Sequence, residues 1–177
     1  MLFSEAHTWE EIMYTPMVIS GLTVDPMTNS PIVILREING NGTLPIWIGL
    51  LEATAIASEL EGIKFSRPMT HDLLKNMMDM VHIEVSKIEV CDLRDNTYYA
   101  RINFEFGGKK MSIDARPSDA IALSLRLDTP IFVSEDVINR STQIDLKSVA
   151  QDKTEKGKEW QEILENLDPD DFGKFKM

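Results

Sequence analysis

The chain has 177 residues, of which 43% are hydrophobic and 27% are charged, a composition typical of a soluble globular protein with a substantial core. Its formal net charge of −11 disfavours loose, non-specific binding of nucleic acid, which needs a basic surface. The single cysteine, Cys91, excludes an internal disulfide, and the absence of a signal peptide pattern and of a long apolar run predicts a cytoplasmic protein that does not contact a membrane.

The first half of the chain predicts a three-stranded meander followed by two helices. Turn signals at Asp25-Pro26 and at Asn39-Gly40-Asn41-Gly42 separate three apolar stretches. Helical spacing of apolar residues follows twice, and Thr70 is expected to cap the second helix. The strands are predicted at 17–24, 32–35 and 44–48, and the helices at 50–63 and 70–81.

The second half repeats this organisation. The apolar residues of one strand change parity, which predicts a bulge near Ser86-Lys87, and Gly107-Gly108 turns the chain between the next two strands. Pro117 ends the last of these, and Ser118 is expected to be the N-cap of a helix. The strands are predicted at 82–93, 98–106, 111–115 and 131–133, the helix ends at Thr129-Pro130, and Ser134 caps a further short helix. Two antiparallel meanders with helices following the strand ends predict an α+β domain with an antiparallel or mixed sheet.

Both ends of the chain are expected to be appendages. Residues 1–14 are predicted to form a short helix or arm, and residues 159–167 have amphipathic spacing. The last segment, 168–177, is polar and predicted to be dispensable for folding. The predicted division is therefore a domain at 1–140 and a C-terminal helix with a polar tail at 141–177.

The candidate functional residues lie at the starts of three predicted helices. Asp114 and Arg116 lie on the polar face of a strand that runs directly into Ser118-Asp119 at the start of a helix. Arg67-Pro68 precedes Thr70-His71-Asp72 in the same way, and Glu52 lies in the first turn of the helix that follows Gly49. Two of the three starts thus share an arginine, a proline, a hydroxyl residue and an acid.

Two explanations fit this pattern. An acid in a first turn stabilises the helix dipole, and an upstream arginine can simply pair with it, which is the favoured explanation for either start alone. Alternatively, free N–H groups and an arginine form a phosphate site, nearby carboxylates hold Mg²⁺ or Mn²⁺, and His71 moves a proton. No zinc-type Cys/His spacing, P-loop or G-x-S-x-G occurs, so the sequence does not support a nucleophilic hydrolase of the serine or cysteine kind.

Several other residues are expected to have packing roles only. The methionines of the second helix, Met77, Met78 and Met80, have the spacing of core residues. Trp47 lies among apolar strand residues and is expected to be packed. The number of apolar, methionine-rich helical faces predicts a homo-oligomer, most simply a dimer.

Three sequence blocks resemble the signature of the bifunctional nuclease (BFN) domain family. They are L-P-I-W-I-G-x-x-E-A at 44–53, R-P-M-T-H-D at 67–72 and A-R-P-S-D-A-I-A-L at 115–123, followed by P-I-F-V at 130–133. The resemblance spans roughly 13–139 and implies a nuclease acting on DNA and RNA. No pattern of the UvrB/UvrC-type helical module found in some relatives follows it. The signature positions are Glu52, Arg67, His71, Asp72, Arg116, Ser118 and Asp119.

The leading prediction is therefore a metal-assisted phosphodiesterase that binds nucleic acid. The predicted catalytic residues are His71, Asp72, Asp119 and Glu52; the predicted substrate-binding residues are Arg67, Arg116 and Ser118; the predicted ligands of Mg²⁺ or Mn²⁺ are Asp72, Asp119 and Asp114. The alternative is a non-enzymatic module that binds a small anion or a partner's carboxylate in the same pocket. A positive groove through Arg67 and Arg116 favours the nuclease, and a small closed polar pocket favours the binding module.

Overall fold

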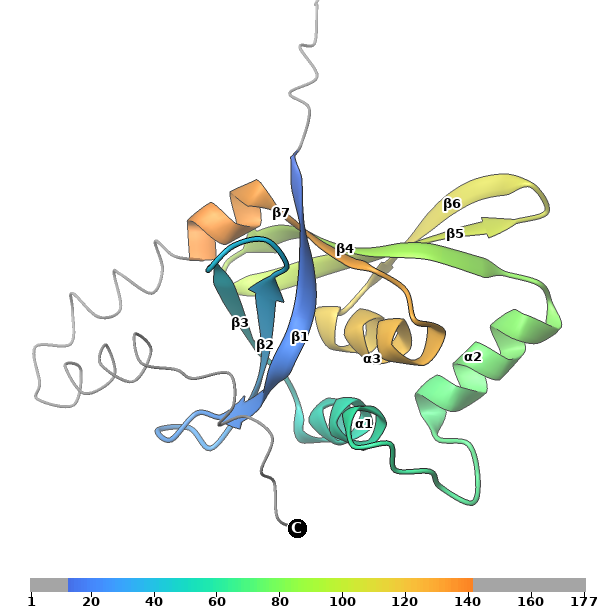
Figure 1. Ribbon diagram of the computed structural model, residues 1–177, viewed down its shortest axis with the longest axis horizontal. Coiled ribbons are helices and arrows are strands. Elements are labelled where there is room, and N and C mark those ends of the chain that lie inside the picture. Colours follow the sequence, from blue (N-terminus) through green and yellow to red (C-terminus); the bar gives the residue numbers. More distant parts are fainter. Residues whose placement is uncertain (1–12, 142–177) are drawn as a thin grey trace, which may run out of the picture.

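Two meanders and a seventh strand form one mixed sheet in the computed structural model, which describes residues 13–141 (Figure 1). The first meander is β1 (Tyr14–Val24), β2 (Pro31–Glu37) and β3 (Thr43–Trp47), and it is followed by α1 (Leu50–Leu60) and α2 (Thr70–Met80). The second is β4 (Glu84–Arg94), β5 (Thr97–Phe106) and β6 (Lys109–Ala115), followed by α3 (Pro117–Leu127) and β7 (Ile131–Ser134). The predicted α+β class is confirmed.

The strand β7 joins the two meanders into one sheet of order β3-β2-β1-β7-β4-β5-β6. It pairs antiparallel with β1 and parallel with β4, whereas the remaining neighbours are antiparallel. The sequence predicts this strand but gives no sign of its position. A helical segment follows β7 from residue 135 to the end of the described chain at 141.

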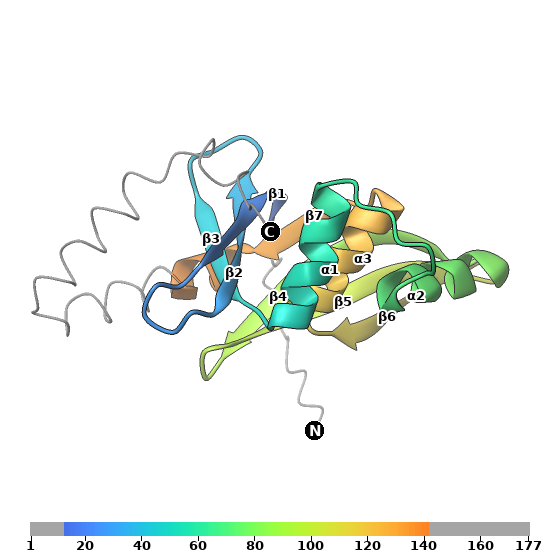
Figure 2. The same cartoon turned by 90° about the horizontal axis from the view of Figure 1, so that it is seen from below.

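Three helices gather on one side of the sheet (Figure 2). The helix α3 packs on β4 and β5, α1 packs on α3 and β2, and α2 packs on α3. Because α3 is surrounded in this way, every residue from Pro117 to Ser124 except Asp119 is buried. The core between sheet and helices includes Val33, Leu35, Leu44, Ile56, Ile88, Val90, Ile121, Leu123 and Val133.

Element boundaries differ from the prediction where a cap was assigned to the wrong residue. The N-cap of α3 is Arg116, because Pro117 takes the first helical position, where its missing N–H removes no bond. The N-cap of α2 is Met69, whose N–H donates to Asp72 Oδ2 at 2.9 Å, so Thr70 is already helical. The predicted bulge is confirmed, since the β4–β5 register shifts between Val85 and Lys87.

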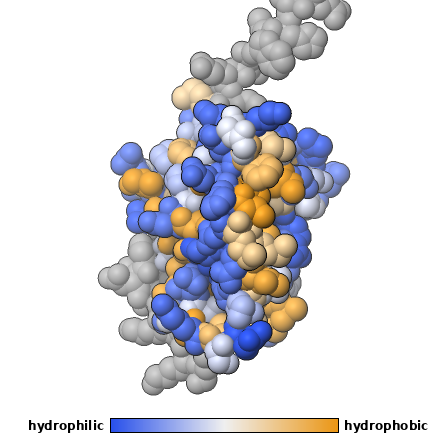
Figure 3. Space-filling view, turned by 90° about the vertical axis from the view of Figure 1, so that its right-hand side faces the viewer, coloured by the Kyte–Doolittle hydropathy of each residue, from blue (hydrophilic) through white to orange (hydrophobic). Residues whose placement is uncertain are grey.

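The prediction that all three methionines of α2 are core residues is wrong. Only Met78 is buried, whereas Met77 and Met80 are 58% and 80% exposed. The helix contacts α3 and leaves its other side uncovered. Figure 3, which views this side of the molecule, shows hydrophobic residues gathered in a band beside a hydrophilic one.

The remaining predictions for the chain ends lie outside the described residues. These are the helix or arm at the N-terminus before residue 13, the helix at 159–167 and the polar tail at 168–177. Among the helices of residues 13–141, none has the length and apolar character needed to cross a bilayer. The division into a domain and a C-terminal segment and the cytoplasmic location stay predictions.

Candidate functional site

The starts of the three helices meet around the guanidinium of Arg116. This side chain donates two hydrogen bonds to Asp119, from Nε to Oδ2 at 2.7 Å and from Nη2 to Oδ1 at 3.1 Å. Its Nη1 lies 2.8 Å from Oε1 of Glu52, which stands in the first turn of α1. The guanidinium therefore bridges two carboxylates from different helices, and a two-point contact of this kind fixes its plane.

The first turn of α2 adds an imidazole to the same carboxylate. Nε2 of His71 lies 3.2 Å from Oδ1 of Asp119, and only 12% of the His71 side chain is exposed. Burial raises the pKa of the Asp119 carboxyl, but the hydrogen bonds from Arg116 and His71 outweigh burial and hold the pKa below its ordinary value. Asp119 is consequently ionised at neutral pH. We define Glu52, His71, Arg116 and Asp119 as the Arg116 cluster.

Asp72 has a different partner, although its sequence context matches that of Asp119. Its Oδ1 accepts from Nε of Arg126 at 2.5 Å, and the Arg126 side chain is only 4% exposed. The same guanidinium donates to the backbone carbonyls of Ala55 and Ala122, so it links all three helices. Burial raises the pKa of the Asp72 carboxyl, but the hydrogen bonds from Arg126 and from the Met69 N–H outweigh burial and hold the pKa below its ordinary value. Asp72 and Arg126 therefore hold the three helices together.

The sequence prediction missed Arg126. A signal was present, because Asp119 and Arg126 are seven residues apart and therefore share one face of the α3 helix. A cation on the buried face of an otherwise apolar helix needs a partner. The partner is Asp72, 54 positions away, which spacing alone does not identify.

The remaining predicted site residues, Arg67, Asp114 and Ser118, are not part of the Arg116 cluster. Arg67 is exposed in the loop between α1 and α2, and Asp114 is exposed on β6 opposite Arg101. Ser118 is buried in the first turn of α3. The predicted metal ligands are thus not brought together, and within residues 13–141 no three side chains of His, Cys, Asp or Glu gather closely enough to hold a metal ion. Arg116 occupies the position between Glu52 and Asp119.

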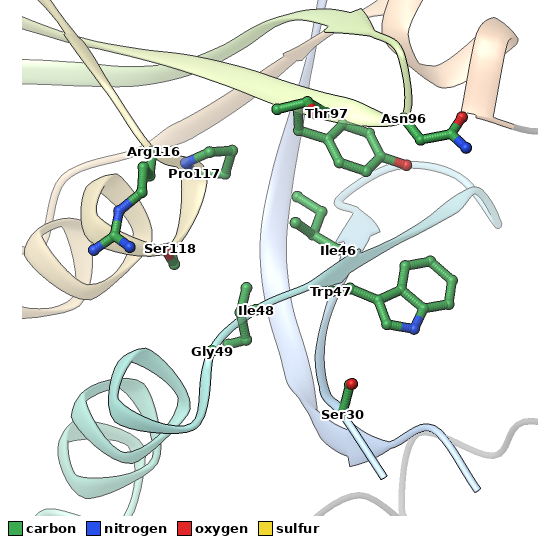
Figure 4. A pocket seen from close by; sticks show the side chains of 11 residues that line it. Ser30, Ile46, Trp47, Ile48, Gly49, Asn96, Thr97, Arg116, Pro117 and Ser118 are labelled. Carbon is green, nitrogen blue, oxygen red and sulfur yellow. The ribbon is translucent and has the colours of Figure 1, made fainter. Parts of the chain in front are cut away.

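A pocket of about 410 Å³ adjoins the Arg116 cluster (Figure 4). It lies between the end of β3, the β4–β5 turn and the start of α3. Trp47, expected to be packed, is 49% exposed here, because β3 is an edge strand that no helix covers at this end. The sequence did not single out the residues of the turn. The lining is Ser30, Ile46, Trp47, Ile48, Gly49, Asn96, Thr97, Tyr98, Arg116, Pro117 and Ser118.

Similarity to known proteins extends over most of the described chain. The family model described as the bifunctional nuclease domain matches residues 33–145. An uncharacterized protein of Mycobacterium tuberculosis is 36% identical over 162 residues, which cover 87% of this chain and 95% of that protein. Bifunctional nuclease 2 of Arabidopsis thaliana is 28% identical over 107 residues, 58% of this chain and 32% of the plant protein. Bifunctional nuclease 2 of Oryza sativa subsp. japonica is 26% identical over 117 residues, 64% of this chain and 36% of the rice protein. The chain therefore belongs to the bifunctional nuclease domain family.

Proposed function

We propose that this protein is a nuclease that hydrolyses phosphodiester bonds of DNA or RNA at the Arg116 cluster. The observation that carries the proposal is the sharing of one carboxylate, Asp119, by a guanidinium and an imidazole that come from separate sequence motifs. A phosphodiesterase needs a cation for the phosphate and a group that moves a proton. The plant relatives named bifunctional nuclease support a nuclease function.

Arg116 is the proposed phosphate ligand. A guanidinium has five N–H donors, and the contacts to Asp119 and Glu52 use three of them. The side chain is 66% exposed, so the remaining donors can reach a phosphate oxygen from solvent. Glu52 and Asp119 hold the guanidinium plane before the substrate arrives, which reduces the ordering cost of binding.

His71 is the proposed general acid or base. When Nε2 donates its proton to Asp119, the lone pair of Nδ1 is available to accept a proton from the attacking water. Asp119 then stabilises the imidazolium that forms, as carboxylates do in histidine–aspartate pairs. The same imidazolium can return the proton to the departing oxygen.

The predicted requirement for Mg²⁺ or Mn²⁺ stays a prediction. The described residues do not fit a bound metal in this arrangement, since Arg116 stands between the two carboxylates of the cluster and, within residues 13–141, no three His, Cys, Asp or Glu side chains are placed to hold one. The proposed chemistry therefore uses the side chains alone. Cleavage measured with EDTA, Mg²⁺ and Mn²⁺ in parallel tests the requirement directly.

The second candidate is the non-enzymatic binding module. The pocket of about 410 Å³ favours it, because this volume suits a small ligand, and Arg116 supplies a cation at its edge. The net charge of −11 also opposes the approach of a long polyanion. In this case the protein binds an anionic ligand tightly and leaves it intact.

The deciding experiment incubates the purified full chain with single-stranded and double-stranded DNA and RNA. The His71→Gln variant should lose cleavage and keep the fold, since the glutamine Nε2 can take the place of the imidazole Nε2 that contacts Asp119 but cannot move a proton. His82→Asn is the matched control, because His82 is exposed with a positive φ of 58°, which asparagine tolerates. Binding without cleavage by the wild-type protein under every metal condition would establish the binding module instead.

A further inference from the structure

We propose that the pocket beside Arg116 binds an unpaired nucleobase, so that the substrate is single-stranded nucleic acid. This inference rests on the proposed nuclease function and specifies its substrate class. Three features of the pocket carry the inference: a held aromatic ring, a lining that suits a base, and a guanidinium shared with the Arg116 cluster.

The aromatic ring is the indole of Trp47. It is 49% exposed at the end of β3, and its Nε1 donates to Oδ2 of Asp25 at 3.0 Å. This bond ties the polar edge of the ring to the β1–β2 turn and fixes the orientation of its faces. A half-exposed tryptophan that is already held loses little conformational entropy when a flat apolar group stacks on it.

The lining matches a base in both size and chemistry. A volume of about 410 Å³ lies within the usual range of small-molecule pockets. Ile46 and Ile48 contribute apolar side chains to the lining, while Asn96 and Thr97 on the β4–β5 turn contribute an amide and a hydroxyl. Amides and hydroxyls both donate and accept hydrogen bonds, as the edges of nucleobases require.

The shared guanidinium connects the base to the scissile linkage. Arg116 lines the pocket and also belongs to the cluster with His71 and Asp119. Figure 4 shows Arg116 and Trp47 on opposite sides of the pocket, with Ile46 and Ile48 between them. A nucleotide with its phosphate at Arg116 therefore has this pocket, with Trp47 at its far end, beside its base.

A paired base cannot use this pocket. Inside a duplex both faces of a base are stacked and its edge is paired, so entry requires the base to leave the helix. Single strands offer such bases at no cost. Stacking also explains how a protein of net charge −11 binds a polyanion, since base–aromatic contact does not require a broad basic surface.

The test uses the fluorescence of Trp47 in the full chain. Three tryptophans are present, and the substitutions Trp9→Phe and Trp160→Phe leave Trp47 as the reporter. The His71→Gln substitution keeps the bound probe intact. Tetrathymidylate should quench the fluorescence, whereas inorganic phosphate at the same concentration should not. A tetrathymidylate–tetraadenylate hairpin duplex should quench far less than the single strand.

Variants then separate stacking from phosphate binding. With a fluorescently labelled tetrathymidylate, Trp47→Leu should raise the dissociation constant on the order of tenfold, and Trp47→Phe should restore most of the affinity. Asn96→Gly, which suits the positive φ of 58°, tests the amide separately. Tyr99→Leu is the matched control, since Tyr99 is an exposed aromatic residue of β5 outside the pocket lining.

The outcomes distinguish this inference from the proposed function. Unchanged affinity in Trp47→Leu, or equal quenching by phosphate and tetrathymidylate, overturns the base pocket even if the wild-type protein cleaves nucleic acid. Specific quenching with a loss of affinity in Trp47→Leu supports the base pocket. If that result is accompanied by no cleavage under any condition, the nuclease proposal fails and the pocket remains a nucleotide-binding site.

Discussion

The imidazole of His71 lies 3.2 Å from the carboxylate of Asp119, measured from Nε2 to Oδ1, although 48 positions separate the two residues. The same carboxylate receives both hydrogen bonds from Arg116. One side chain thus orients the proposed proton-transfer group and the proposed phosphate ligand together. Helix capping alone explains the acid in the first turn of α3, but it does not require a histidine from α2 beside it.

Substituting Asp119→Asn should therefore abolish most activity while the fold persists. The amide keeps the size of the carboxylate, but it loses the charge that stabilises an imidazolium and one of the two acceptors for Arg116. Since positioned acid–base groups contribute about a hundredfold or more, we expect cleavage to fall by at least about a hundredfold. Circular dichroism and thermal melting report the fold. A protein that unfolds but retains full activity per folded molecule would show that Asp119 serves only the helix.

Asp72→Asn should have the opposite result. Arg126 is 4% exposed, and the substitution leaves its buried charge with neutral acceptors and with Glu59 at 3.9 Å. Disrupting a hydrogen bond to a buried charge costs about 1–3 kcal/mol. Urea unfolding should show a loss of this size, while cleavage per folded molecule remains near that of the wild type. A catalytic role for Asp72 would be indicated by full stability combined with lost cleavage.

The stability of the protein should fall in acid because of the same two carboxylates. Asp72 and Asp119 both have folded-state pKa values below the ordinary aspartate value, on account of Arg126 and Arg116 respectively. A lowered pKa contributes stability that is fully present above the ordinary value and is lost as the pH falls through the folded value. Unfolding free energies should therefore be flat from pH 7 to about pH 5 and decrease below about pH 4. The double variant Asp72→Asn/Asp119→Asn should show a shallower acid decrease than the wild type.

The sequence predicted the strands well because alternation and turn residues are local signals. The bulge beside Lys87 follows from a parity change, and the β5–β6 hairpin follows from two glycines. Partners distant in the chain could not be predicted in this way. Asp72 and Asp119 have the same local pattern, yet Asp119 pairs with the arginine three residues earlier, whereas Asp72 pairs with Arg126. The upstream Arg67 lies exposed in a loop.

Burial was also mispredicted where it depends on what covers an element. Trp47 and Met80 have the spacing of core residues, and both are exposed. In each case the reason lies in the tertiary structure. Trp47 is on β3, which is an edge strand, and Met80 is on α2, whose extensive contacts are with α3 alone among the described helices and strands. Sequence periodicity identifies an apolar face but does not identify its cover.

The homo-oligomer predicted from the sequence stays a prediction, and the uncovered face of α2 is where we expect the second copy. Met77 and Met80 are exposed there, and an exposed apolar surface of this kind is typical of an interface. Light scattering of the full chain should give the mass of a dimer, and Met80→Glu should shift it towards the monomer. Met27→Glu is the control, since Met27 is 70% exposed in the β1–β2 turn. A wild-type monomer at micromolar concentration would refute the prediction.

Gly49→Ala should separate the positioning of Arg116 from the stability of the helix. A Cβ at this N-cap position would lie 2.2 Å from Oε2 of Glu52, whose side chain folds back over the glycine. The backbone there has φ −76° and ψ 160°, so alanine adds no strain, and the flexible end of Glu52 must move instead. We expect a stability change within about 1 kcal/mol.

Because Arg116 then loses its contact to Glu52, KM for an oligonucleotide should rise severalfold with kcat little changed. Glu52→Gln should produce a similar rise, and the double variant should be no worse than either single variant, since both changes remove one interaction. Additive effects of the two substitutions, or an unchanged KM in Gly49→Ala, would show that Glu52 does not position Arg116 for substrate.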